Sequence, residues 1–149
     1  MPLNGTKGEL LTINAPLLKV ERVIKSSVFI IPAGNNLYRI GATYKWKDKT
    51  NEPTLEARQE LKAKLDTFLN CDYKIVNHVA GIRPTVADRR PLAGRHPVYN
   101  NMYLLNGFGS RGVMIAPYAS HQLLEFIENG RVIDPEMDIS RYDKDYIEV

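Results

Sequence analysis

Three glycines in the C-terminal third of the chain have a spacing that often accompanies a nucleotide cofactor. In the stretch LLNGFGSRGVMIAP, from Leu104 to Pro117, Gly107, Gly109 and Gly112 fit a G-x-G-x-x-G pattern. Where this pattern follows a strand and opens a helix, the glycines permit a tight turn whose N–H groups face a pyrophosphate. The spacing therefore raises the question of whether a dinucleotide binds here.

The position of these glycines argues against a self-contained dinucleotide-binding domain. Such a domain carries the motif after its first strand and needs further strands and helices behind it, but this motif lies late in a chain of 149 residues. Pro117 is a second objection, because a helix opened at Gly112 would need the N–H that proline lacks. The glycines either make a tight turn with nothing bound, or meet a cofactor in another way.

Other residues with chemical potential are few. Arg83, in the stretch GIRP, carries a guanidinium that can bind a carboxylate through two parallel hydrogen bonds; the alternative is an ion pair, for instance with Asp88. The three histidines lack metal-ligand spacing, and one cysteine excludes an internal disulfide and a cysteine-based zinc site. We therefore predict no metal site and assign no catalytic side chain. His78 is expected to be a packed or hydrogen-bonded histidine rather than a base.

Length and composition indicate one soluble globular domain. The hydrophobic fraction of 44% and the charged fraction of 25% are ordinary, and the net charge of +3 comes from interspersed acidic and basic residues. No basic run dominates, so we expect no nucleic-acid partner. The N-terminus does not read as a signal peptide and no apolar run reaches membrane-spanning length. We expect no membrane partner and a cytoplasmic location.

The strands that would position these residues favour an α+β fold with a mostly antiparallel sheet and an early β-hairpin. The first strand is predicted over Gly8–Ile13. An apolar run at 28–31 and a return strand at 37–46 form the hairpin, and alternation buries one face of the return strand. Its turn is Gly34-Asn35-Asn36, three residues that tolerate positive φ.

Two main helices are predicted. The first covers 55–69 after an entry at Thr54, and its apolar residues recur at helical spacing: Ala57, Leu61, Leu65, Phe68 and Leu69. Glu60 and Lys64 form an i,i+4 pair on its exposed side. The second helix follows the glycine turn and runs to about Asn129, with Gly130 as a left-handed stop.

The remaining segments complete the predicted organisation. Residues 73–84 form a strand whose ladder Pro84 would end, a loop carries Pro91, Gly94 and Pro97, and 101–106 form a short strand. We predict one substrate- and flavin-capping domain over residues 1–131 and an extended tail over 132–149.

Three blocks of the sequence together resemble the C-terminal, substrate-domain part of the FAD-dependent amine and D-amino-acid oxidoreductases (the DAO family), especially its glycine oxidase-like branch. The blocks are FIIPAGNNLYRIGATY, AGIRPTVADRRPLAGRHP and NMYLLNGFGSRGVMIAP. The resemblance runs from about Gly8 to Ile127. It implies FAD as the cofactor and a sheet-based substrate domain that covers the flavin ring.

The resemblance also implies site residues. The turn that would contact the flavin comprises Gly107, Phe108, Gly109, Ser110, Arg111, Gly112, Val113 and Met114. A helix N-terminus suits the negative charge on the pyrimidine edge of reduced flavin. Arg83 matches the family's arginine for the substrate carboxylate. Arg111 either reaches the substrate or points to solvent, because glycine oxidases place their second arginine where this chain has Ser110.

The hairpin departs from the family pattern. Phe29 stands where glycine oxidases have a substrate-binding tyrosine. Tyr44 matches a position that faces the active site in those enzymes, so it could bind substrate in place of the lost hydroxyl. The alternative for Tyr44 is cross-strand packing.

The family's N-terminal Rossmann segment, which grips the ADP part of FAD, has no counterpart in this sequence. We expect the C-terminal part of an oxidoreductase, whether an expressed fragment, a split-gene product or a mispredicted start. It would retain FAD poorly and be inactive alone, because one turn cannot offset the cost of immobilising a flavin.

The expected reaction of the complete protein is oxidation of an amino acid or small amine by hydride transfer to flavin. The expected partners are that substrate, the missing Rossmann segment and a possible second copy of the chain, since a face left uncovered would be apolar. The alternative is a non-catalytic α+β binding or assembly module.

Overall fold

The computed structural model describes residues 2–145. Contacts between residues divide the chain into two compact units. The first, here called the sheet unit, is residues 6–82; the second, the C-terminal unit, is the described part of residues 1–5 and 83–149. This division differs from the predicted one at residue 131.

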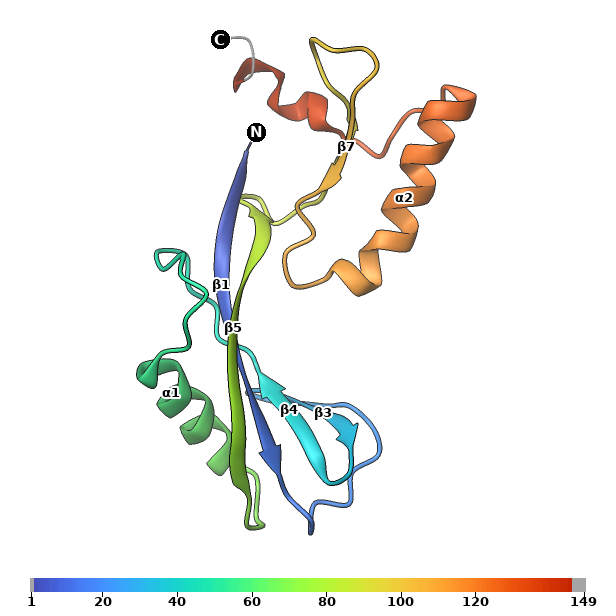
Figure 1. The fold of residues 1–149 in the computed structure, drawn as a ribbon. Helices are drawn as coiled ribbons and strands as arrows, with labels where there is room; N and C mark the ends of the chain where they lie inside the picture. Colours follow the sequence, from blue (N-terminus) through green and yellow to red (C-terminus); the bar gives the residue numbers. More distant parts are fainter. Residues whose placement is uncertain (1, 146–149) are drawn as a thin grey trace. The chain divides into compact units, whose positions relative to one another are not determined.

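A five-stranded sheet in the order β2-β3-β4-β1-β5 is the main β structure, and Figure 1 labels β1, β3, β4 and β5. The β2–β3, β3–β4 and β4–β1 pairs are antiparallel. With two helices and this sheet, the structure confirms the predicted α+β class. The strands are β1 (Leu3–Asn14), β2 (Ile24–Lys25), β3 (Phe29–Gly34), β4 (Leu37–Gly41) and β5 (Lys74–Val86).

The early hairpin of β3 and β4 forms as predicted, but its return strand is shorter. Gly34, Asn35 and Asn36 have φ of 81°, 52° and 60°, the left-handed values that this turn needs. Tyr38 and Ile40 are buried on the inner face. Strand β4 ends at Gly41 instead of residue 46. Beyond it, the N–H of Thr43 donates to the carbonyl of Glu9, and Lys45 pairs with Lys7 in an isolated bridge.

Helix α1 (Leu55–Asp66) begins where the sequence predicts and ends three residues early. The Thr54 hydroxyl accepts a hydrogen bond from the N–H of Ala57, so Thr54 is the N-cap. Leu61 and Leu65 are fully buried against the sheet core, which includes Leu11, Ile13, Ile30 and Ile40. Thr67 is the C-cap of the helix. Phe68 therefore lies beyond the helix and is 37% exposed, so it is not part of the buried apolar face.

A buried polar cluster in the sheet unit joins β1 to the segment before α1. The Nζ of Lys7 lies 2.6 Å from Oδ2 of Asp48 and 2.9 Å from Oγ1 of Thr50. The carboxylate of Glu9 accepts hydrogen bonds from the N–H and the hydroxyl of Thr54 at 2.8 and 2.9 Å. Hydrogen bonds from Lys7 and Thr50 lower the pKa of Asp48 to about 2.

The C-terminal unit is built on a second hairpin, formed by β6 (Leu92–Arg95) and β7 (Tyr103–Asn106), which pair antiparallel. The predicted loop over 91–97 is therefore wrong, because Leu92–Arg95 is a strand with Leu92 and Ala93 fully buried. Its short run containing Gly94 has little strand character of its own; pairing with β7 and burial provide the stability.

Helix α2 (Gly112–Asn129) packs on this hairpin, and the ring of Phe126 lies edge-on to Tyr103 at 6.4 Å. Gly130 closes the helix with φ of 64°, as predicted. The objection from Pro117 was wrong: the helix opens at Gly112 and contains Pro117. Within residues 2–145, neither α2 nor any other helix combines the length and apolarity needed to cross a membrane.

Strand β5 continues through Pro84 to Val86, so the prediction that Pro84 ends its ladder was wrong. Because β5 is an edge strand, the missing N–H of proline can face away from the neighbouring strand. This extension carries Thr85 and Val86 into the C-terminal unit.

Buried apolar residues anchor part of the segment for which an extended tail was predicted. Ile133, Met137 and Ile139 are each at most 4% exposed, and a 3-10 helix (η1) spans Ile139–Asp145. The N–H of Ala93 donates to the carbonyl of Met137 at 2.8 Å. Apolar side chains at these spacings thus fix the segment against β6. Residues 146–149 of the predicted tail lie outside the described residues.

Candidate functional site

The glycine turn and the end of β5 meet inside the C-terminal unit. The N–H of Gly109 donates to the carbonyl of Pro84 at 2.8 Å. Phe108 also pairs with Thr85 in an isolated antiparallel bridge. Arg83 directly precedes Pro84, so its backbone adjoins the turn. The fold therefore brings together two of the predicted elements, the arginine and the glycine turn.

Arg83 is half-buried and shares a face of β5 with Thr85, because side chains alternate along a strand. Thr85 is 1% exposed, and its side-chain atoms lie 3.7 and 3.8 Å from the place that a Cβ on Gly109 would occupy. The turn contacts the side chain of Thr85 at Gly109 and that of Val86, on the opposite face of β5, at Gly107. Arg83 therefore lies at the end of β5 that the turn covers. A guanidinium placed there is fully charged and can take both oxygens of a carboxylate.

The turn requires glycine at its centre. Gly107 and Gly109 have φ of 77° and 55°, in the left-handed region. A Cβ on Gly107 would lie only 2.6 Å from Cγ2 of Val86, so this position also permits close packing against β5. The Asn106 side chain further fixes the turn by accepting a hydrogen bond from the N–H of Gly107.

The N-terminus of α2 follows the turn without a side-chain cap. Arg111 is the N-cap and makes no side-chain capping bond, and the first turn contains no acidic residue. The N–H groups of Gly112 and Val113 have no acceptor within the helix. The side chains of Val113 and Met114 are 97% and 81% exposed.

This arrangement fits the edge of a flavin. Peptide N–H groups at a helix N-terminus stabilise partial negative charge, and the exposed apolar side chains beside them suit a planar ring. Phe108 is half-buried against the core of the unit and Ser110 is exposed. The residues predicted to meet such a group are those from Gly107 to Met114.

Arg111 has a partner that the sequence did not indicate. Its Nη2 donates to the carbonyl of Arg89 at 2.6 Å. The guanidinium therefore ties the start of α2 to the loop between β5 and β6. No sequence signal marks this contact, because the acceptor is a backbone carbonyl.

The other candidate residues belong to the sheet unit. Tyr44 is 36% exposed and packs edge-on against Trp46, with 5.6 Å between ring centroids. Phe29 lies in β3 opposite Gly41 of β4. The Nε2 of His78 is 2.9 Å from Oε2 of Glu9, and the His78 side chain is 12% exposed. Residues 29 and 78 are thus parts of the packed sheet unit.

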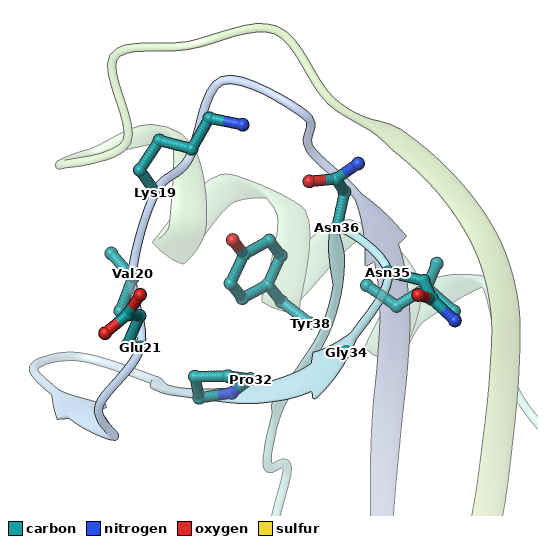
Figure 2. Close-up of a pocket in the computed structure, with 9 residues that line it drawn as sticks. Lys19, Val20, Glu21, Pro32, Gly34, Asn35, Asn36 and Tyr38 are labelled. Atoms are coloured by element: carbon teal, nitrogen blue, oxygen red, sulfur yellow. The ribbon is translucent and has the colours of Figure 1, made fainter.

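Both units contain cavities. One cavity, of about 450 Å³, lies in the sheet unit, and Figure 2 shows Lys19, Glu21 and Asn36 around the ring of Tyr38. The Tyr38 hydroxyl donates to the carbonyl of Leu18, and none of the predicted site residues lines this cavity. A second cavity, of about 370 Å³, adjoins Arg111 in the C-terminal unit.

The chain is similar to a set of flavin-dependent enzymes. The family model "DAO: FAD dependent oxidoreductase" matches residues 1–125. The glycine oxidase of Bacillus subtilis (strain 168) is 27% identical over 143 residues, which cover 93% of this chain and 38% of that protein. The chain thus spans well under half of this relative's length.

Solved structures share the fold. L-proline dehydrogenase from P. horikoshii matches with a TM-score of 0.79 and 19% identity, covering 97% of this chain and 41% of its own. Glycine oxidase from Bacillus cereus ATCC 14579 matches with a TM-score of 0.73 and 20% identity, covering 87% and 37%. Given the family match over most of the sequence, the chain belongs to the DAO family of FAD-dependent oxidoreductases.

Proposed function

We propose that this chain supplies the substrate-binding and flavin-facing part of an FAD-dependent oxidoreductase that acts on an amino acid or a small amine. Family membership and the similarity to glycine oxidase support this function. The observation that carries it is the hydrogen bond from Gly109 to Pro84, because it sets Arg83 beside the turn.

In this proposal Arg83 binds the substrate and the turn holds the cofactor. The Arg83 guanidinium takes the substrate carboxylate through two hydrogen bonds, which orients the α-carbon and its amine. Within the predicted stretch from Gly107 to Met114, the N–H groups of Gly112 and Val113 at the start of α2 would hold the pyrimidine edge of the flavin. FAD, when bound, supplies the two-electron acceptor that takes a hydride from the substrate. The chain itself contributes orientation and charge placement, and an amine that arrives neutral needs no side-chain base.

Tyr44 and Arg111 have separate proposed roles. The Tyr44 hydroxyl is a candidate contact for the substrate, replacing the hydroxyl that Phe29 lacks. Arg111 lies one position after that of the family's second substrate arginine, and its bond to the Arg89 carbonyl favours a supporting role in the site. The variant Tyr44→Phe, which lacks the hydroxyl, tests the first role, because substrate affinity should fall while flavin binding stays the same.

The proposal also includes a partner for the ADP half of FAD. A flavin held by residues 107–114 alone would bind weakly, since the ordering cost of a large ligand needs more contacts. Exposed apolar residues of α2 offer a surface for the polypeptide that completes the fold: Val113, Met114, Leu124 and Ile127. The alternative occupant is a second copy of this chain, which the sedimentation coefficient of the purified protein distinguishes.

The test is a flavin titration with and without the FAD-binding portion of a relative. The chain is titrated with FAD alone and after mixing with the part of Bacillus subtilis glycine oxidase that the match does not span. We expect a bound flavin absorbance band in the mixture and its anaerobic bleaching by at least one amino acid. Arg83→Ala should keep the band and prevent bleaching, whereas Arg58→Ala, an exposed arginine on α1, should change neither. A mixture that stays colourless and inactive overturns the proposal in favour of a binding or assembly module.

A further inference from the structure

The C-terminal segment, residues 131–145, lies beyond the part of the chain that the family model matches, which ends at residue 125. It is nonetheless anchored in the C-terminal unit. Ile133 and Met137 share a core cluster with Ala93 and Ala119. Asp138 also pairs with Ala93 in a parallel bridge. The segment is therefore a built part of this unit.

Arg141 is the residue through which this segment contacts the loop between β5 and β6. Its guanidinium donates to Oδ2 of Asp88 at 3.1 Å and to the carbonyls of Arg90 and Pro91 at 3.3 and 2.9 Å. A further bond to the carbonyl of Asp138, at 2.9 Å, holds the guanidinium in place. The Arg141 side chain is 18% exposed, so most of its surface contacts protein and little of it contacts solvent.

The loop that Arg141 contacts has a fixed, tight geometry. The N–H of Arg89 donates to the carbonyl of Val86. Arg89 has φ of 59°, a backbone conformation that residues other than glycine rarely adopt. The N–H of Arg90 donates to Oδ1 of Asp88. Burial would raise the pKa of Asp88, but the hydrogen bonds from Arg90 and Arg141 lower it below its usual value.

This loop is continuous with the candidate site. Val86 is the last residue of β5, two residues after Pro84. Its side chain packs so closely against Gly107 that a Cβ there would overlap with it. Arg111, the N-cap of α2, holds the same loop through the carbonyl of Arg89. The loop is thus held on one side by Arg141 and on another by Arg111, and it contacts the glycine turn through Val86.

We propose that Arg141 is a positioning residue, which fixes the 86–91 loop and through it the junction between the end of β5 and the glycine turn. The inference rests on the proposed function for the meaning of that junction. Arginine suits the task because a planar guanidinium can donate to three acceptors at once, which a lysine ammonium on a flexible stem does less well. The segment beyond the family match then has a role in substrate and flavin binding without touching either.

The test compares Arg141→Gln and Arg141→Lys with Arg131→Gln in the full chain. Arg131 lies in the same segment, but its side chain is 71% exposed and forms an ion pair with Glu125 near the end of α2. Amide hydrogen exchange is followed by NMR at Arg89, Gly109 and, as an internal control, Leu11 of the sheet unit. We expect at least tenfold faster exchange at Arg89 and Gly109 in Arg141→Gln, a smaller increase in Arg141→Lys, and no change in Arg131→Gln.

Faster exchange at Arg89 with an unchanged Gly109 would reduce Arg141 to a local loop anchor, and unchanged exchange at both would overturn the proposal outright. If Arg141→Gln does not fold, Asp88→Asn removes one acceptor and should give the same pattern at lower amplitude. In the flavin-loaded mixture described above, Arg141→Gln should raise KM for the amino acid at least fivefold, with kcat changed less. If no variant binds flavin, the proposed function fails while the exchange result still decides the role of Arg141.

Discussion

The peptide N–H of Gly109 lies 2.8 Å from the carbonyl oxygen of Pro84, and this bond joins the glycine turn to the end of β5. Both partners are backbone groups, so the contact depends on the path of the chain and not on a recognisable pair of side chains. Arg83, the candidate for binding substrate, directly precedes Pro84 in the chain. The bond therefore places Arg83 beside the turn that faces the cofactor in the proposed function. The first prediction tests this arrangement.

Replacing Arg83 with lysine keeps the charge but loses the second parallel hydrogen bond to a carboxylate. A charge-assisted hydrogen bond contributes about 1.5–3 kcal/mol, so KM for a carboxylate substrate should rise roughly 10- to 100-fold while kcat changes less. Steady-state kinetics of the flavin-loaded mixture measure this. Arg58→Lys on α1 is the matched control and should match the unsubstituted protein. A fall in kcat with an unchanged KM would remove Arg83 from the carboxylate site.

The glycine turn should tolerate no side chain at Gly107. Gly107→Ala carries the left-handed backbone penalty of about 1–2 kcal/mol, plus about 1–3 kcal/mol for the overlap with Val86. Gly130→Ala isolates the first contribution, because Gly130 has φ of 64° with no atom within 4 Å of an added Cβ. Urea unfolding followed by circular dichroism measures both. Equal losses of unfolding free energy in the two variants would mean that Val86 shifts to make room for the added methyl group.

The buried polar cluster predicts a loss of stability in acid. The pKa of Asp48 is about 2 in the folded chain against an ordinary value of 3.8, because Lys7 and Thr50 donate to it. A depressed folded-state pKa stabilises the fold above the unfolded value, and that contribution disappears as the pH falls from about 4 to about 2. Asp48→Asn should therefore lower the melting temperature at pH 6 and flatten its dependence on pH in this window. Asp72→Asn, at an exposed carboxylate, provides the control, and identical slopes for the two variants would contradict the assignment.

Thr54 links the first turn of α1 to the buried carboxylate of Glu9. Its hydroxyl accepts from the N–H of Ala57 at 3.2 Å and donates to Glu9 at 2.9 Å. Thr54→Ala should reduce the free energy of unfolding by about 1–2 kcal/mol, and Thr54→Ser should restore most of it. Thermal unfolding of the two variants measures the difference. A serine variant as unstable as the alanine variant would place the effect in the lost methyl group.

Local elements were predictable because their signals are local. The hairpin follows from Gly34-Asn35-Asn36 and the alternation through Tyr38 and Ile40, and α1 follows from Thr54 and the helical spacing of Leu61 and Leu65. The ion pair between Glu60 and Lys64, 2.7 Å in the structure, is likewise readable from an i,i+4 spacing.

Elements stabilised by distant partners were missed. Leu92–Arg95 is a strand because β7 pairs with it and the carbonyl of Met137, which is distant in sequence, accepts from Ala93. Strand β5 passes Pro84 because it lies at an edge of the sheet. The tail was read as extended because Ile133, Met137 and Ile139 follow no regular period, although each is buried.

The residues alone identified the family blocks, the glycine turn and Arg83 as a carboxylate-binding candidate, since motif spacing and side-chain chemistry are written in the order of the chain. Only the folded chain shows that the turn reaches β5 through Pro84, that Arg111 holds the carbonyl of Arg89, and that Arg141 holds the same loop. The acceptors in these contacts are peptide carbonyls, which every residue possesses, and so no residue type marks them in the sequence.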